Sequence, residues 1–268
     1  MSDSDSPLND MQSQYQYDGS NEVCPDDSFA ERSLPGFKLA LEGRRSIRLY
    51  DGKPIPEDIM KDCLRDATLA PSSSNLQPYE LYWVRDTNKK EAIAHACLGQ
   101  PAATSAGELI VCVARRDLWE SNLKKLVSIM TRGGKKELSP PLKKYYLGLL
   151  PKVLRNDSLG LNNFFRRLLF FFTGLKKPML RTPINQGDHR IWAHIQTSLV
   201  SQTLMLSLAA HGYDSCPMGG MDEKRVKKAL DLPAKAEVSM VISAGKRKDE
   251  GLYGPRVRLP EEDLIKVV

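Results

Sequence analysis

Two short polar segments carry the side chains best suited to chemistry. Residues 44–48 read RRSIR and place three guanidiniums and one hydroxyl in a single stretch. Residues 70–78 read APSSSNLQP and place three hydroxyls and two side-chain amides between two prolines. Guanidiniums offer a rigid fork of donors that suits phosphate, whereas hydroxyls and amides orient sugars and heterocycles. Together the segments predict a site for a phosphorylated, polyhydroxylated and aromatic ligand, a description that a flavin nucleotide fits.

Each segment alone also has an ordinary explanation. Residues 44–48 suit a charged loop in solvent, and residues 70–78 suit a turn-rich loop, because Ser and Asn favour turns. The position of the two segments favours ligand binding over two unrelated loops, because both segments flank one predicted amphipathic helix. That helix begins after Pro54-Ile55-Pro56, and its apolar stripe recurs every three or four residues at Ile59, Cys63, Ala67 and Ala70.

The remaining elements follow from apolar periodicity and turn residues. One or two helical turns are expected over residues 35–42, with Gly43 ending them. Strands are predicted at 79–84, 108–114 and 237–244, and helices over about ten residues up to Leu98, over 190–211, and from Asp222 to Leu230. This order lacks a regular strand–helix–strand alternation, so the predicted fold class is α+β.

The bulk properties are those of a globular protein. Its 268 residues, 41% of them hydrophobic, can bury a full core as one large domain or two small ones. The polar residues 1–33 are expected to form a disordered or loosely attached tail ahead of a domain over 34–268. The tail lacks the features of a secretion signal, and no apolar run reaches the roughly 18 residues that span a bilayer, which favours a cytoplasmic protein. Five scattered cysteines and the histidine spacings predict reduced thiols and no metal site.

The net charge of +6 is concentrated in one region. Residues 132–181 hold twelve basic and two acidic side chains, a net +10, so the rest of the chain is at −4. This region belongs to a predicted basic, Phe-rich insert at about 118–187, in which residues 164–172 read FFRRLLFFF. The favoured interpretation is a helical cap over the ligand pocket. A helix lying on an anionic membrane surface, possible through residues 132–181, is the second interpretation, and nucleic-acid binding is disfavoured because the basic residues interleave with bulky aliphatics.

Further signals follow in order towards the C-terminus. A PMGG segment stands at 217–220, a strand ends near Gly245, and a basic pair precedes Pro260. With these signals in this order, the chain resembles the FMN-dependent nitroreductase family over roughly residues 36–116 and 188–263. The resemblance implies a nitroreductase-like α+β fold, with a central, mainly antiparallel sheet flanked by helices, in an intertwined homodimer with FMN at the subunit interface.

The resemblance also implies cofactor-binding roles for particular residues. The phosphate, ribityl chain and pyrimidine edge of FMN would meet Arg44, Arg45, Ser46, Arg48, Arg256 and Arg258. The flavin held by the partner subunit would meet Pro71, Ser72, Ser73, Asn75 and Gln77. The flavin ring would lie against a turn formed by Pro217, Met218, Gly219 and Gly220. The backbone N–H groups of the two glycines would point at N5 and O4, and no catalytic side chain is implied because the flavin carries the chemistry.

The implied activity is that of an FMN-dependent NAD(P)H oxidoreductase. It would reduce nitroaromatic, quinone or enone-type acceptors by a ping-pong hydride mechanism through flavin N5. NADPH or NADH would be the co-substrate, and the basic insert favours NADPH through its extra phosphate. Two alternatives stay open: another flavin reaction of the superfamily, dehalogenation or flavin fragmentation, and a membrane-recruited flavin-binding protein that uses the basic insert.

A few positions near these motifs need separate comment. Gly219 stands where many family members carry an acidic residue, so we expect flavin binding to survive there and substrate preference to be open to change. Further pyrimidine contacts are expected around residues 100–104. Cys216 is expected to be a small buried residue in preference to a redox thiol, and Trp192 to pack in the core or a dimer interface.

Overall fold

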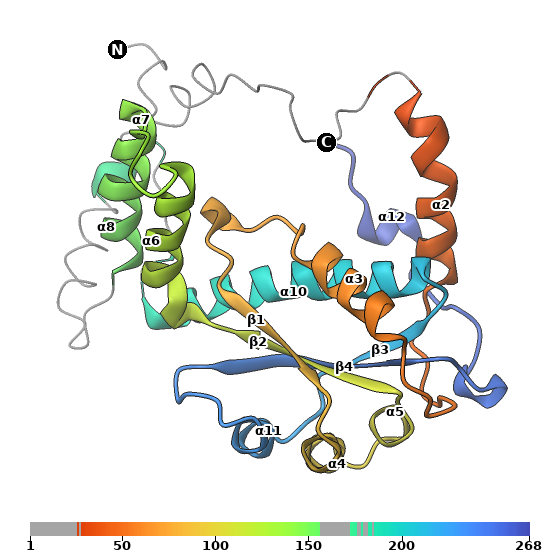
Figure 1. Ribbon diagram of the computed structural model, residues 1–268. Coiled ribbons are helices and arrows are strands. Elements are labelled where there is room, and N and C mark those ends of the chain that lie inside the picture. Colours follow the sequence, from red (N-terminus) through yellow and green to blue (C-terminus); the bar gives the residue numbers. More distant parts are fainter. Residues whose placement is uncertain (1–25, 27, 156–171, 176–177, 179–181, 184) are drawn as a thin grey trace.

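A four-stranded antiparallel sheet forms the centre of the computed structural model, which describes residues 26, 28–155, 172–175, 178, 182–183 and 185–268. The strand order is β1-β2-β4-β3. The strands are β1 (Tyr79–Val84), β2 (Glu108–Ala114), β3 (Asp214–Met218) and β4 (Glu237–Gly245). Helices cover both faces of the sheet (Figure 1), and every residue of the central strand β2 is buried.

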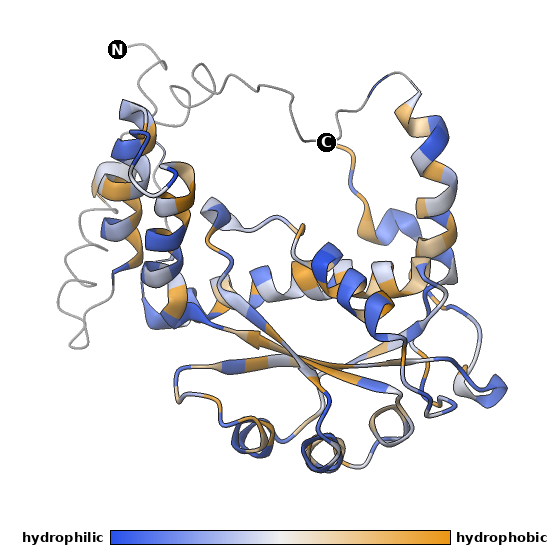
Figure 2. Cartoon of the chain, in the orientation of Figure 1, coloured by the Kyte–Doolittle hydropathy of each residue, from blue (hydrophilic) through white to orange (hydrophobic). Residues whose placement is uncertain are grey.

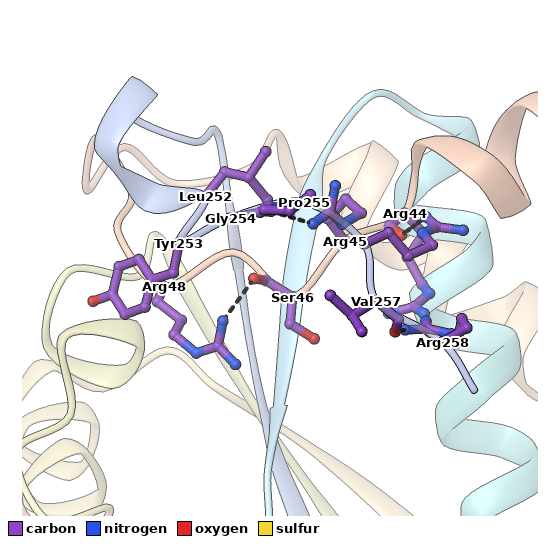
Figure 3. A pocket seen from close by; sticks show the side chains of 11 residues that line it. Arg44, Arg45, Ser46, Arg48, Leu252, Tyr253, Gly254, Pro255, Val257 and Arg258 are labelled. Carbon is purple, nitrogen blue, oxygen red and sulfur yellow. Dashed lines mark hydrogen bonds between the residues drawn. The ribbon is translucent and has the colours of Figure 1, made fainter. Parts of the chain in front are cut away.

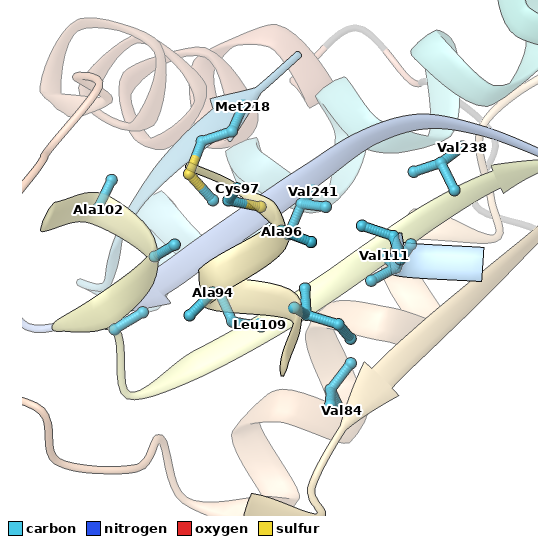
Figure 4. Close-up of a cluster of buried hydrophobic side chains, with 14 of the residues drawn as sticks. Val84, Ala94, Ala96, Cys97, Ala102, Leu109, Val111, Met218, Val238 and Val241 are labelled. Atoms are coloured by element: carbon cyan, nitrogen blue, oxygen red, sulfur yellow. The ribbon is translucent and has the colours of Figure 1, made fainter. Parts of the chain in front are cut away.

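Strand β2 sends alternate side chains into two separate cores, as the pleat requires. Leu109 and Val111 enter a cluster beneath three helices, part of which Figure 4 shows. These helices are α4 (Thr87–Ala96), α5 (Pro101–Thr104) and α11 (Glu223–Ala229). Ile110 and Cys112 enter the opposite cluster, beneath α3 (Glu57–Ala67) and α10 (Gln186–Ala210). Sheet and helices therefore form three layers around two cores.

Helix α10 is the longest element and runs across one face of the sheet (Figure 1). Its 25 residues span about 37 Å at the usual helical rise. Asn185 and Asp188 close its start with a capping box, and Gly212 follows its end at φ +74°, a conformation that favours glycine. The predicted helix over 190–211 is thus confirmed, with an earlier start.

The insert is helical where the structure describes it. Its elements are η3 (Arg116–Leu118), α6 (Trp119–Met130), α7 (Pro140–Lys143), η4 (Lys144–Leu149) and α8 (Leu150–Leu154). They share a small core of their own, built around Leu123, Tyr146, Leu150 and Leu154, which also takes in Leu76 from the APSSSNLQP segment. Of the predicted Phe-rich run at 164–172, only Phe172 lies within the described residues.

Several predicted elements agree with the structure and others need correction. Strands 79–84 and 108–114 have the predicted bounds, and Asp222 caps α11 by accepting a hydrogen bond from the Arg225 N–H. Helix α2 (Phe29–Gly43) begins earlier than predicted, inside the segment expected to be a tail, and continues through Pro35. The remaining short elements are η2 (Ser73–Asn75), η5 (Asp249–Gly251) and α12 (Glu261–Leu264).

Among the described helices, none combines the length and apolar character needed to cross a bilayer.

Candidate functional site

Two segments that are far apart in the sequence, 44–48 and 252–258, meet in a pocket of about 310 Å³ that we call the arginine pocket (Figure 3). The RRSIR segment is joined to β3 by a parallel bridge between Ser46 and Ser215, and to η5 by a hydrogen bond from Arg48 N–H to Gly251 O of 2.9 Å. The lining residues are Arg44, Arg45, Ser46, Arg48, Leu252, Tyr253, Gly254, Pro255, Arg256, Val257 and Arg258. All six residues predicted to surround the phosphate, ribityl chain and pyrimidine edge therefore lie together.

The arginine pocket carries five guanidiniums with no carboxylate in an ion pair with any of them, within the described part of the chain. Their protein partners are backbone carbonyls: Arg45 donates to Gly254 O at 2.6 Å, and Arg256 donates to Glu42 O at 2.6 Å and Arg44 O at 2.8 Å. Burial lowers the pKa of Arg44, and the nearby Arg256 and Arg258 lower it further. Like charges held this close favour the binding of an anion.

Arg44 provides a more specific sign of that ligand. Its Nε atom is buried and has no hydrogen-bond partner in the protein. A buried donor left unpaired costs free energy, so buried donors almost always have a partner. Phosphate oxygens are strong acceptors for guanidiniums. The donor set of the arginine pocket therefore fits the phosphate of a flavin nucleotide.

The APSSSNLQP segment forms a constrained loop, residues 71–77, which we call the serine loop. Ser74, Asn75 and Gln77 have φ of +55°, +54° and +46°, a conformation that costs free energy for residues other than glycine. The loop is held by hydrogen bonds from outside and within: Ser73 N–H donates to Gln196 Oε1 at 2.8 Å, and Gln77 N–H donates to Ser72 Oγ at 3.1 Å. Backbone strain of this kind is typical of functional loops.

One chain does not bring the serine loop to the arginine pocket. The loop is bonded to Gln196, in the first half of α10, whereas Gly43, at the edge of the arginine pocket, lies beside Ala209 near the end of that helix. The helical rise separates Gln196 from Ala209 by about 20 Å. Figure 1 shows η2 and the end of α2 near opposite ends of α10. The two predicted halves of the site therefore stay apart within the single chain.

The PMGG segment does not form the turn that was predicted. Pro217 and Met218 are the last two residues of the edge strand β3, and only Gly219 and Gly220 lie beyond it. A Cβ atom placed on Gly219 would meet no protein atom within 4 Å, so the fold itself leaves open space there. The Gln100 side-chain amide donates to Gly220 O at 2.9 Å, which brings one of the residues expected around 100–104 to this segment.

Cys216 lies between the arginine pocket and the PMGG segment. It is buried, and burial raises the pKa of its thiol against the opposing effects of Arg48 and Ser46. A raised pKa keeps the thiol protonated and unreactive, which supports the packing interpretation. Trp192 packs against the core of the insert, which agrees with the first of its two predicted roles, packing in a core. The described residues contain no group of three or more potential metal ligands.

Comparison with known proteins identifies the family. The model of the nitroreductase family matches residues 41–246. The chain belongs to the nitroreductase family. It is 30% identical over 224 residues to a protein of Bacillus subtilis named as the NAD(P)H nitroreductase YdgI, with 82% of this chain and 93% of that protein covered. It is 28% identical over 239 residues to a protein of Thermus thermophilus named NADH dehydrogenase, with coverage of 88% and 98%.

A solved structure is similar in both fold and sequence. A protein of Exiguobacterium sibiricum described as a nitroreductase, crystallised in complex with FMN, aligns with a TM-score of 0.61 and 25% identity over 93% of this chain and all of that chain. The α+β class and the antiparallel sheet agree with this similarity. As a member of the nitroreductase family, the protein is an oxidoreductase. The family match ends before Arg256 and Arg258, whose place in the site rests on the pocket geometry.

Some residues that shape the site were not predicted from the sequence. Gln196 holds the Ser73 amide from 123 residues away, and the Asn122 side-chain amide donates to Leu76 O at 3.0 Å. Tyr253 lies beneath the Arg48 guanidinium, 5.2 Å from ring centroid to Cζ. The sequence signal for Gln196 was its amide side chain on the apolar helix α10. A polar side chain that is buried on such a helix needs a hydrogen-bond partner.

Proposed function

We propose that the protein is an FMN-dependent NAD(P)H oxidoreductase that reduces nitroaromatic, quinone or enone-type acceptors. The observation that carries the proposal is the arginine pocket, in which five guanidiniums lack a carboxylate and a buried Nε lacks a partner. The parallel bridge from Ser46 to Ser215 joins this pocket to the strand that leads to Gly219 and Gly220. The names of the relatives and the FMN complex of the Exiguobacterium protein support the same chemistry.

The residues of this chain would divide the binding of FMN among themselves. Arg44, Arg256 and Arg258, with Arg45 beside them, would hold the phosphate, since guanidiniums bind phosphate through paired hydrogen bonds. Ser46 and Arg48 would contact the sugar chain and the pyrimidine edge. The open space at Gly219 would let the backbone approach a planar ring. FMN, when bound, supplies the hydride chemistry at its ring, and the residues around it bind, orient and shield it from water.

The active form proposed is a homodimer. Because about 20 Å of helix α10 separates the serine loop from the arginine pocket, a complete site needs the loop of a second chain. Helix α2 exposes Leu34, Phe37, Leu39 and Leu41 by 41–72% of their surfaces. Figure 2 shows hydrophobic colouring on parts of this helix. A row of exposed apolar side chains of this size marks a protein interface. In the dimer, Pro71, Ser72, Ser73, Asn75 and Gln77 of one chain would face the flavin held by the other.

Steady-state kinetics of the FMN-loaded protein test the activity. Initial rates measured against NAD(P)H and a quinone or nitroaromatic acceptor should give parallel double-reciprocal lines, because donor and acceptor would use the same site in turn. NADPH should give the higher kcat/KM because the basic insert attracts its additional phosphate. A clear preference for NADH would reject the coenzyme assignment, and an FMN-loaded protein that oxidises neither coenzyme would reject the function. Halide release from halogenated substrates, or consumption of the flavin itself, would favour the other superfamily reactions instead.

A second candidate function is recruitment to an anionic membrane surface. Residues 119–155 hold nine basic and two acidic side chains, and Ile129 and Leu147 in this region are 73% and 51% exposed. Basic and apolar groups together suit a membrane interface. Flotation with anionic and neutral vesicles tests this, using Lys143→Glu/Lys144→Glu in the insert and Lys227→Glu/Lys228→Glu on α11 as the matched control. Equal flotation of both variants would reject recruitment through the insert.

A further inference from the structure

An apolar cavity of about 430 Å³ lies between the insert and the first half of α10. Its inner wall is formed by the buried side chains of Leu150 and Val153 from α8. Its outer wall is formed by Ile191 and Ile195 from α10, which are 61% and 53% exposed. The volume falls in the range of about 300–1,000 Å³ that small-molecule sites occupy. The cavity is therefore large enough, and open enough at its rim, to admit a ligand.

The cavity has one polar end, and that end is the serine loop. Ser73 and Ser74 line it, and the Ser74 and Tyr145 hydroxyl oxygens lie 2.8 Å apart there. The serine loop is the segment proposed to face the flavin of the partner chain. A molecule lying in the cavity would thus extend from the redox centre to the space between α8 and α10.

The charges around the cavity restrict the class of ligand. Among the described residues that line it, none is Lys or Arg, and the carboxylate is that of Asp188, which closes the start of α10 by accepting the Asn185 N–H. An anionic group, such as a fatty-acid carboxylate, would gain no cationic partner there and would meet a carboxylate. A neutral apolar chain would instead gain from leaving water.

We propose that this cavity binds the apolar tail of a neutral, amphipathic electron acceptor, such as an alkyl- or isoprenyl-substituted quinone, whose ring lies at the serine loop. This inference rests on the proposed function and specifies its substrate. In the net reaction, NAD(P)H loses a hydride, which carries two electrons, and becomes NAD(P)⁺. The quinone gains that hydride and one proton from the solvent and becomes the hydroquinone.

The test compares two quinones with the same ring, one carrying a methyl group and the other a decyl chain. On the FMN-loaded enzyme at saturating NAD(P)H, the decyl quinone should have a KM about 30-fold lower or more, because each buried methylene favours binding. Val153→Trp fills the cavity and should abolish this preference, so that the two quinones have equal KM values. Leu147→Trp is the matched control, since Leu147 belongs to the same insert, is 51% exposed and does not line the cavity.

Binding without turnover gives an independent readout. Trp192 lines the cavity, so the decyl quinone should quench its fluorescence in the absence of NAD(P)H, and Trp192→Phe identifies the part of the signal that belongs to it. Val153→Phe, a smaller substitution, replaces Val153→Trp if the latter fails to fold. Equal KM values for the two quinones on the unsubstituted enzyme, or a tail preference that survives filling of the cavity, would overturn the proposal. If neither quinone is reduced while the decyl quinone still quenches Trp192, the cavity assignment stands and the proposed function fails.

Discussion

At the scale of single residues, recognition of an anion rests on Arg44 and the two C-terminal arginines. Arg44→Ala should weaken FMN binding about 10- to 100-fold, because a hydrogen bond to a charged group contributes about 1.5–3 kcal/mol. Fluorescence titration with FMN and with riboflavin measures this effect. Riboflavin lacks the phosphate, so its affinity should change much less.

Arg85→Ala is the control for that substitution, since Arg85 pairs with Glu57 at an exposed site away from the pocket. Its FMN affinity should equal that of the unsubstituted protein. An Arg44→Ala variant that loses FMN and riboflavin affinity equally would mean that the pocket does not hold the phosphate.

Gln196 is expected to act as a positioning residue for the serine loop. Gln196→Leu leaves the Ser73 N–H without its acceptor, and loss of about 1 kcal/mol should speed hydrogen exchange in residues 72–77 about fivefold. Gln202→Leu, an exposed position on the same helix, should leave exchange in the loop unchanged. Equal exchange in both variants would show that the loop holds its shape without Gln196.

The binding residues could be predicted where their own chemistry identifies them. Arg44, Ser46 and Arg48 are recognisable because guanidiniums and hydroxyls concentrate in one short segment, and the structure brings them into one pocket with Arg256 and Arg258. The supporting residues could not be predicted in this way. Gln196 and Asn122 act on backbone groups far away in the sequence, and only the fold determines which groups they meet.

At the scale of elements, the predicted bounds were correct for the edge strand β1 and the central strand β2, whereas the edge strand β3 was not predicted. Strand β2 is buried throughout and was predicted with its exact bounds. Strand β3 was not predicted because Asp214 and Pro217 disfavour a strand. The sheet tolerates Pro217 because β3 lies at its edge, where a missing backbone N–H is harmless. The insert was predicted as a helical cap, but the bounds of its separate helices were not predicted. Most of these helices are short, and their stability comes from their shared core.

Glu237 connects α10 to the start of β4 and predicts a pH dependence of stability. Burial raises the pKa of its carboxyl, but hydrogen bonds from Arg190 and His194 outweigh that effect and the net shift is downward. A lowered folded pKa contributes stability above the unfolded value of about 4.3, and this contribution is lost as the pH falls through the folded pKa.

Glu237→Gln should therefore destabilise the protein at neutral pH by about 1.5–3 kcal/mol. The difference from the unsubstituted protein should shrink as the pH falls below about 4.3. Thermal unfolding of the flavin-free protein between neutral and acidic pH measures it, with the exposed Glu250→Gln as control. A difference that stays constant over this range would contradict the role of the carboxylate.

At the scale of the whole molecule, we expect each complete site to be formed by two chains. A heterodimer of one Arg44→Ala chain and one Ser73→Trp chain should contain one intact site and one with both defects. Such a heterodimer, purified through two different affinity tags, should keep about half of the normal activity, because a two-fold dimer has two equivalent sites. If the loop and the pocket of the same chain formed the site, both sites would be defective and the heterodimer would be inactive.

The central claim is that the arginine pocket makes this chain a flavoprotein. Its most direct test is the absorbance spectrum of the purified protein after addition of excess FMN and removal of the unbound flavin by gel filtration. We expect bound oxidised flavin in an amount equal to that of the chain, bleached when NADPH or NADH is added under anaerobic conditions. A protein that retains no flavin after this treatment would mean that the arginine pocket does not bind FMN.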